Sequence, residues 1–209
     1  MLFRSNDPDF AKALAANGDL YVNDAFSAAH RAHASTEGLA HLLPAYAGEQ
    51  MRLELSALDK ALGKPDRPVL GIVGGSKVST KLDLLSHLVT KLDKLAIGGG
   101  MANTFLLAAG QPVGKSLCEP GMVDAAREVT ATLKARGARL FLPTDVVVAD
   151  AVSEAAVPAI KPVTEVGGSD LVLDFGPQSM RRLVDELEAC KTIVWNGPSG
   201  VFEFDKFAG

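Results

Sequence analysis

Lys77 and Lys81, which follow a glycine turn, are the side chains best placed to bind an anionic ligand. The apolar run Val69–Val73 predicts a strand, Gly74 to Ser76 a tight turn, and the segment from Val78 to Lys91 an amphipathic helix. On this prediction Lys77 and Lys81 share one helix face, where the positive end of the helix dipole makes cations unfavourable. A polyphosphate bound by turn N–H groups and both ammonium groups would offset that cost. The pattern therefore predicts a nucleotide site.

The alternative is an ordinary strand–helix turn with two solvated lysines. The segment does not complete a Walker A loop, because Ser76 precedes the lysine and Val78 follows it. Neither Gly74-Gly75 nor Gly98-Gly99-Gly100 completes the G-x-G-x-x-G fingerprint of dinucleotide sites. A phosphate site here would be of a different kind.

Composition narrows the class of protein. The chain has 209 residues, 47% hydrophobic and 6% aromatic residues, and 20 glycines, which favours an α/β fold. The net charge of −4 gives no reason to expect nucleic-acid binding. We expect no membrane span and no signal peptide. Cys118 and Cys190 stand alone, as in a reduced, cytoplasmic protein, and the four histidines lack the spacing of a metal site.

Strands and helices alternate regularly after Asp66. Further apolar strands are expected at 94–97, 139–142, 146–149, 171–175 and 192–195, and helices at 101–109, 120–136 and 177–189. Strands that are apolar throughout predict a parallel sheet covered on both faces, in which ligands bind at the carboxyl edge. Three strands end in glycine turns (Gly74-Gly75, Gly98–Gly100 and Asn196-Gly197-Pro198), so we expect the site at that edge.

The first part of the chain is different. Helices are expected at 7–16, which Pro8 would start, and at 48–62, which Gly63 would end, with a lone strand at 20–22. A lone strand cannot form a core. We therefore expect residues 1–47 to be the remnant of another domain, 48–64 an interdomain helix and 65–209 an incomplete nucleotide-binding domain.

Six segments of the chain resemble the phosphoglycerate kinase family. They are 23–26, 29–36, 74–81, 98–105, 142–149 and 195–203, in family order. The resemblance runs from about Asn6 to Phe207. It implies a Rossmann-like nucleotide domain joined to the remnant of a second α/β domain.

The resemblance also implies a function. Family members pass a phosphoryl group between 1,3-bisphosphoglycerate and ADP, giving 3-phosphoglycerate and ATP with Mg²⁺, in glycolysis. They are typically monomeric and cytoplasmic. The acceptor in the reverse direction is a carboxyl group. Such a transfer depends mainly on alignment and charge neutralisation.

The resemblance assigns roles to individual residues. Lys81 corresponds to the lysine that contacts the transferring phosphoryl group, and Arg31 to an arginine that binds the glycerate phosphate, so both are candidate catalytic residues. Glu203 corresponds to the carboxylate that binds the ribose hydroxyls. The remaining nucleotide-binding candidates are Ser76, Lys77, Gly98, Gly99, Gly176, Gly197 and Val201.

The family pattern continues before Asn6 and beyond Phe207, into a glycine-rich loop whose aspartate holds the metal. We therefore expect an internal fragment that lacks the family's protein ligand for Mg²⁺. Three hypotheses stay open: a phosphoglycerate kinase, a non-catalytic nucleotide-binding fragment of that enzyme, and a folding or interaction module without a ligand. We expect little or no turnover from this polypeptide alone.

Overall fold

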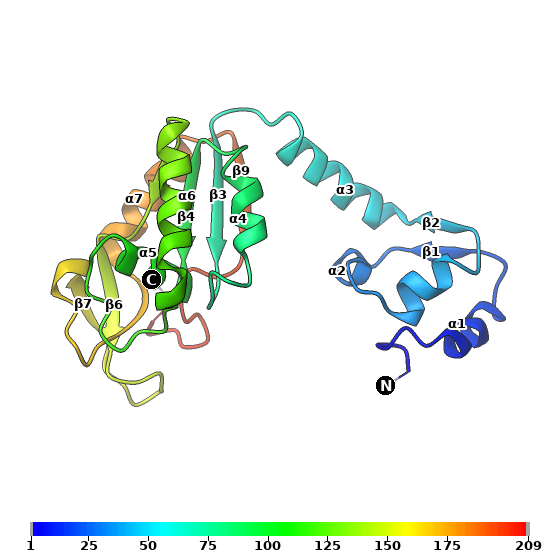
Figure 1. Cartoon of the computed structure of the whole chain (residues 1–209), viewed down its shortest axis with the longest axis horizontal. Coiled ribbons are helices and arrows are strands. Elements are labelled where there is room, and N and C mark those ends of the chain that lie inside the picture. Colours follow the sequence, from blue (N-terminus) through cyan, green and yellow to red (C-terminus); the bar gives the residue numbers. More distant parts are fainter. Residues whose placement is uncertain (1, 208–209) are drawn as a thin grey trace. The chain divides into compact units, whose positions relative to one another are not determined.

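The structure is a computed structural model that describes residues 2–207 (Figure 1). The chain divides into two compact units, Met1–Lys64 (unit 1) and Pro65–Gly209 (unit 2). None of the helices between residues 2 and 207 combines the length and the hydropathy that a membrane span requires.

A four-stranded parallel sheet is the centre of unit 2, and several of its strands are labelled next to one another in Figure 1. Its order is β5-β4-β3-β9, with β3 at Val69–Gly74, β4 at Lys94–Gly98, β5 at Arg139–Phe141 and β9 at Thr192–Asn196. Every residue of β3 and β4 is buried, as expected for inner strands covered on both faces. The prediction of an α/β fold with a parallel, Rossmann-like sheet is confirmed.

The expected strands at 146–149 and 171–175 do form, but in a second sheet. β6 (Asp145–Ala149) lies between β7 (Ala159–Pro162) and β8 (Leu171–Phe175), and both pairings are antiparallel. The prediction of one parallel sheet was therefore wrong for these strands, and β7 was not predicted.

The physical reason is that both faces of β6 are covered. Val146 and Val148 pack in one apolar cluster with Leu106, while Val147 and Ala149 pack in another. An antiparallel strand buried on both faces has the same continuous apolar pattern as a parallel one. Local sequence could not distinguish them.

Helices cover the sheets of unit 2. They are α4 (Leu82–Leu88), α5 (Gly99–Ala108), α6 (Val123–Ala135) and α7 (Pro177–Glu188), with short 3₁₀ turns at Pro120–Met122 and Val163–Glu165. The prediction of a helix from Val78 to Lys91 was too long at both ends. Side chains explain the late start: Ser79 bonds to Glu119, and the Thr80 hydroxyl donates to Lys77 O over 2.9 Å. Such local bonds compete with helix formation.

Unit 1 holds α1 (Pro8–Ala15), β1 (Tyr21–Asn23), α2 (Phe26–Ala29), a π-helical turn (Ala34–Gly38), β2 (Ala45–Ala47) and α3 (Glu49–Leu62). The α1 and α3 predictions are confirmed: Asp7 Oδ1 accepts from Phe10 N over 2.8 Å, Pro8 is the first helical residue, and Gly63 follows α3. The expected lone strand was wrong, because β1 pairs in parallel with β2. Burial is sparse here, with Ala11, Ala34 and Met51 as the buried hydrophobic residues among those described.

A buried carboxylate holds the start of α7. Asp145 accepts hydrogen bonds from the Gln178 amide (3.0 Å) and the Ser179 amide (2.6 Å), two of the free N–H groups of the first helical turn. The Ser179 hydroxyl lies 2.6 Å from the same carboxylate. Burial raises the pKa of Asp145, but the bonds from Ser179 and Gln178 outweigh it, so the pKa lies below its ordinary value.

We expect Asp145→Asn to lower the free energy of unfolding at pH 7 by about 1–3 kcal/mol, because an amide group in this position is a weaker acceptor. A depressed folded pKa stabilises the fold above the unfolded value of about 4, and this contribution is lost as the pH falls through the lower, folded pKa. Urea unfolding between pH 7 and pH 3 checks both points. The matched control is Asp150→Asn, since Asp150 is exposed. Equal pH slopes for the wild type and Asp145→Asn would contradict the assignment.

Candidate functional site

The carboxyl ends of three adjacent strands meet at one edge of the parallel sheet. Gly74 of β3 is in register with Gly98 of β4, and Val73 with Asn196 of β9. Each strand continues directly into its glycine turn. The prediction that the three turns share one edge is confirmed.

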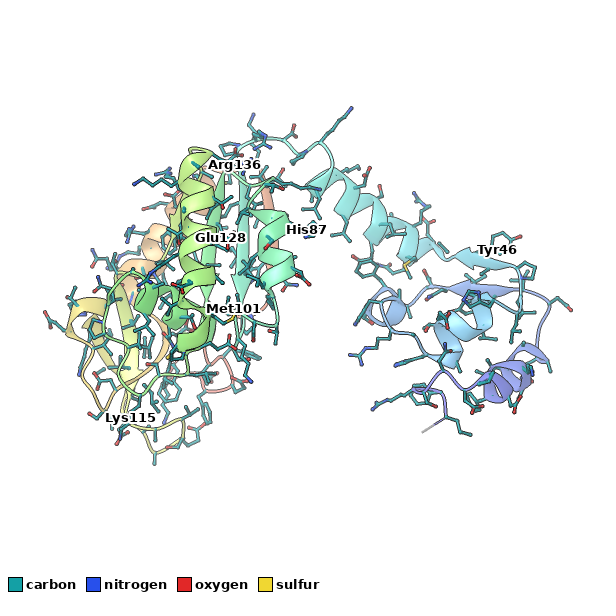
Figure 2. The ribbon with its side chains drawn as sticks, in the orientation of Figure 1. Tyr46, His87, Met101, Lys115, Glu128 and Arg136 are labelled. Atoms are coloured by element: carbon teal, nitrogen blue, oxygen red, sulfur yellow. The ribbon has the colours of Figure 1, made fainter. Side chains whose placement is uncertain are left out.

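The three turns pack backbone against backbone. A Cβ at Gly98 would lie 2.7 Å from Ser199 Cα, and one at Gly99 would lie 2.7 Å from Gly75 O. Hydrogen bonds join the same segments, from Gly99 N to Ser199 O and from Met101 N to Gly75 O over 3.0 Å. Met101 stands at the start of α5, as Figure 2 shows. These glycines are therefore required for packing between the turns, independently of any ligand.

Lys81 reaches into this edge. Its Nζ donates to Gly74 O over 2.6 Å and lies 2.5 Å from Asn196 Oδ1 and 3.5 Å from Asn196 O. Partial burial lowers the pKa of the Lys81 ammonium. The expected uncompensated cation thus has three oxygen partners, all neutral.

Lys77 has a different environment, so the prediction that both lysines share a helix face was wrong. Lys77 lies in the turn before α4, and Lys81 is the residue that caps the helix. The Ser79 hydroxyl and amide donate to the Glu119 carboxylate over 2.6 and 3.0 Å. These bonds hold the pKa of Glu119 below its usual range, and attraction by Lys77 acts in the same direction. Glu119 is a carboxylate close enough to attract the Lys77 ammonium.

A pocket of about 290 Å³ lies beside the turns. Four of the predicted nucleotide-binding residues line it: Ser76, Gly99, Val201 and Glu203. Most of the remaining lining side chains are apolar, namely Leu117, Val152, Leu171, Val172, Leu173, Pro198 and Phe202. The pocket and the lysine are adjacent, because a Cβ at the lining residue Gly75 would lie 3.6 Å from Lys81 Nζ.

This arrangement suits a ligand with a flat apolar part and an anionic part. The apolar walls can cover an aromatic ring, as in most small-molecule sites. The turn at Gly75 leads from the pocket to Lys81, whose ammonium can bind phosphate oxygens. Glu203, which is exposed, lines the same pocket and can accept hydroxyl hydrogen bonds.

Four other predicted residues, Gly98, Gly197, Gly176 and Arg31, do not line the pocket. Gly98 and Gly197 form the packed turns, and a Cβ at Gly197 would lie 3.0 Å from Lys81 Nζ. Gly176 follows β8 and precedes α7, where its amide donates to Asp145 O over 2.9 Å. Arg31 belongs to unit 1, in the turn after α2. Its carbonyl accepts from the Thr36 hydroxyl over 2.6 Å.

Sequence reasoning missed three residues of this region. Asn196 stands in a turn that the sequence singled out, and its polar side chain at a strand end was the available signal. Glu119 and Asn103 gave no signal, because each forms a hydrogen bond with a residue at least 14 positions away in the sequence. Asn103 is 1% exposed and donates from Nδ2 to Leu117 O over 3.1 Å, which fixes one wall of the pocket.

Comparison with known proteins decides the family. A family model described as phosphoglycerate kinase matches residues 4–209. The chain belongs to the phosphoglycerate kinase family. A phosphoglycerate kinase of Caulobacter vibrioides (strain NA1000 / CB15N) is 63% identical over 202 residues, and one of Xanthobacter autotrophicus is 57% identical over 202 residues. Each alignment covers 97% of this chain and 51% of the relative, so the chain spans about half the length of these family members.

Solved structures of the family agree with this assignment. The phosphoglycerate kinase of Coxiella burnetii has a TM-score of 0.85 and 43% identity, and the similarity covers 100% of this chain and 54% of that one. The enzyme from Pyrococcus horikoshii OT3 has a TM-score of 0.79 and 29% identity, with 94% and 50% of the two chains covered. The fold described above is therefore the fold of about half of a phosphoglycerate kinase.

We expect Gly99→Ala to destabilise unit 2 more than Gly110→Ala. Both glycines have positive φ, +64° and +79°, so alanine costs about 1–2 kcal/mol of backbone strain at either position. A Cβ at Gly110 meets nothing within 4 Å, whereas one at Gly99 meets the Gly75 carbonyl. Urea unfolding gives the loss in the free energy of unfolding for each variant. The amount by which the loss for Gly99→Ala exceeds that for Gly110→Ala measures the contribution of the contact between the turns. Equal losses for the two variants would show that this contact does not contribute to the stability of unit 2.

Proposed function

We propose that this chain is the nucleotide-binding part of a phosphoglycerate kinase, with ADP and ATP as its ligands. The observation that carries the proposal is the adjacency of the apolar pocket to Lys81 at the glycine-turn edge. In this proposal the base and ribose occupy the pocket, with Glu203 accepting from the ribose hydroxyls. The phosphates follow the turns at Ser76 and Gly99 toward Lys77 and Lys81.

For the complete enzyme we propose reversible phosphoryl transfer between 1,3-bisphosphoglycerate and ADP. Lys81 would contact the transferring group, and Arg31 would bind the phosphate of the glycerate substrate. A guanidinium suits that role, since its paired N–H donors match phosphate oxygens. The names and identities of the relatives support this reaction for the family. The proposal includes a monomeric protein in the cytoplasm, with no nucleic-acid partner.

In this proposal Mg²⁺ binds together with the nucleotide. Between residues 2 and 207 the structure gathers no set of three or more His, Cys, Asp or Glu side chains that could hold a metal ion. In this proposal the nucleotide phosphates and water supply most of the ligands of the ion.

The second candidate is a nucleotide-binding fragment without catalysis. The fact that favours it is length, since the chain spans about half of its relatives. A coupled assay with ATP and 3-phosphoglycerate measures whether this chain by itself catalyses the transfer proposed for the complete enzyme. We expect little or no turnover from this chain alone, and turnover near that of a complete relative would overturn that expectation.

Titration calorimetry of this chain with MgADP tests nucleotide binding. We expect saturable binding, and a loss of about tenfold to a hundredfold in affinity for Lys81→Ala, because a hydrogen bond to a charged group contributes about 1.5–3 kcal/mol.

The matched control is Lys91→Ala, which removes the same charge from an exposed position beyond the far end of α4. We expect it to bind MgADP like the wild type. Absence of binding by the wild type would overturn the nucleotide proposal. Equal affinity of the wild type and Lys81→Ala would overturn the role of Lys81 alone.

A further inference from the structure

The acceptors around Lys81 are neutral. Its Nζ contacts Gly74 O, Asn196 Oδ1 and Asn196 O, and no carboxylate among the described residues contributes to its pKa shift. An amide oxygen can fix the direction of an ammonium group while leaving its full charge available to a ligand. A carboxylate in the same place would fix it equally well but would cancel the charge.

Asn196 is itself held firmly. It ends β9 in register with Val73 of β3, so its backbone belongs to the sheet. The turn that follows is closed by a hydrogen bond from Trp195 Nε1 to Gly197 O over 2.8 Å. The Asn196 side chain therefore projects from a rigid element, which is the condition for positioning another group closely.

We propose that Asn196 is a positioning residue that holds the Lys81 ammonium beside Gly75 with its charge intact, ready for a polyphosphate. This inference rests on the proposed nucleotide site and extends it to a residue outside the set of expected ligands. Phosphate oxygens would take over donors that now reach Asn196 Oδ1 and Gly74 O, so the lysine need not be ordered anew when the ligand arrives. Holding a long side chain in place beforehand lowers the entropy cost of binding.

The Asn196→Asp substitution separates positioning from packing. Aspartate has nearly the same shape as asparagine, and Asn196 is exposed, so the fold should tolerate the change. The new carboxylate pairs with Lys81 and cancels its charge. We expect MgADP affinity to fall by about tenfold or more, as for the loss of a charge-assisted bond. Asn196→Ala should lose affinity less, because the charge stays but is no longer held.

A second measurement does not depend on nucleotide. The pKa of Lys81 can be followed by NMR of ¹⁵N,¹³C-lysine, with its signal assigned from the spectrum of Lys81→Ala. Burial lowers this pKa in the wild type, and we expect Asn196→Asp to raise it, since a carboxylate favours the ammonium form. An unchanged pKa would show that the side chain at position 196 does not contact the Lys81 ammonium.

The matched control is Gln111→Glu, which changes the net charge by the same amount. Gln111 follows the far end of α5, a helix of 10 residues whose first turn contacts the site. We expect Gln111→Glu to keep both the Lys81 pKa and MgADP affinity at the wild-type values.

The possible failures are distinguishable. If the wild type does not bind MgADP, the proposed function fails, and the Lys81 pKa still tests the contact with Asn196. If the wild type binds MgADP but Asn196→Asp binds it equally well, or leaves the Lys81 pKa unchanged, the positioning role is overturned.

Discussion

The close contact of three glycine turns at one sheet edge is the constraint on which the rest of this site depends. Parallel pairing of β3 with β4 and β9 brings the strand ends together, and the absence of side chains lets the turns touch through their backbones. A Cβ at Gly98 or Gly99 would lie within 2.7 Å of the neighbouring turn. The turns must therefore be glycine before any ligand is considered.

This packing brings polar groups close to the side chains of Lys77 and Lys81. The Gly74 carbonyl and the Asn196 side chain both face Lys81, while Ser79 ties the turn before α4 to Glu119. The two lysines that look equivalent in sequence thus differ in environment. One is fixed by neutral oxygens, and the other lies in a turn whose nearby carboxylate attracts it.

The pocket depends on the meeting of two different sheets. Its lining combines the turns of the parallel sheet with Leu171–Leu173 of β8, which belongs to the antiparallel sheet. The segment after β9 joins them, since Val201 N donates to Leu173 O over 2.9 Å. Asp145 fixes α7 against the same antiparallel sheet. Packing in the antiparallel sheet therefore shapes one wall of the proposed nucleotide site.

Residues close together in the chain specify the local elements, the shared edge and the family. Apolar runs fixed β3, β4 and β9, Asp7 and Pro8 fixed α1, and the glycine turns identified the edge, because each of these depends on residues close in the chain.

The partners of these elements and side chains depend on long-range contacts. The antiparallel pairing of β6, the pairing of β1 with β2, and the bonds from Ser79 to Glu119 and from Lys81 to Asn196 join residues distant in sequence. A strand's apolar pattern reports how deeply it is buried, and the same pattern arises in parallel and antiparallel sheets. Likewise, the charge of a lysine is visible in the sequence, but the oxygens that orient it are brought to it by the fold.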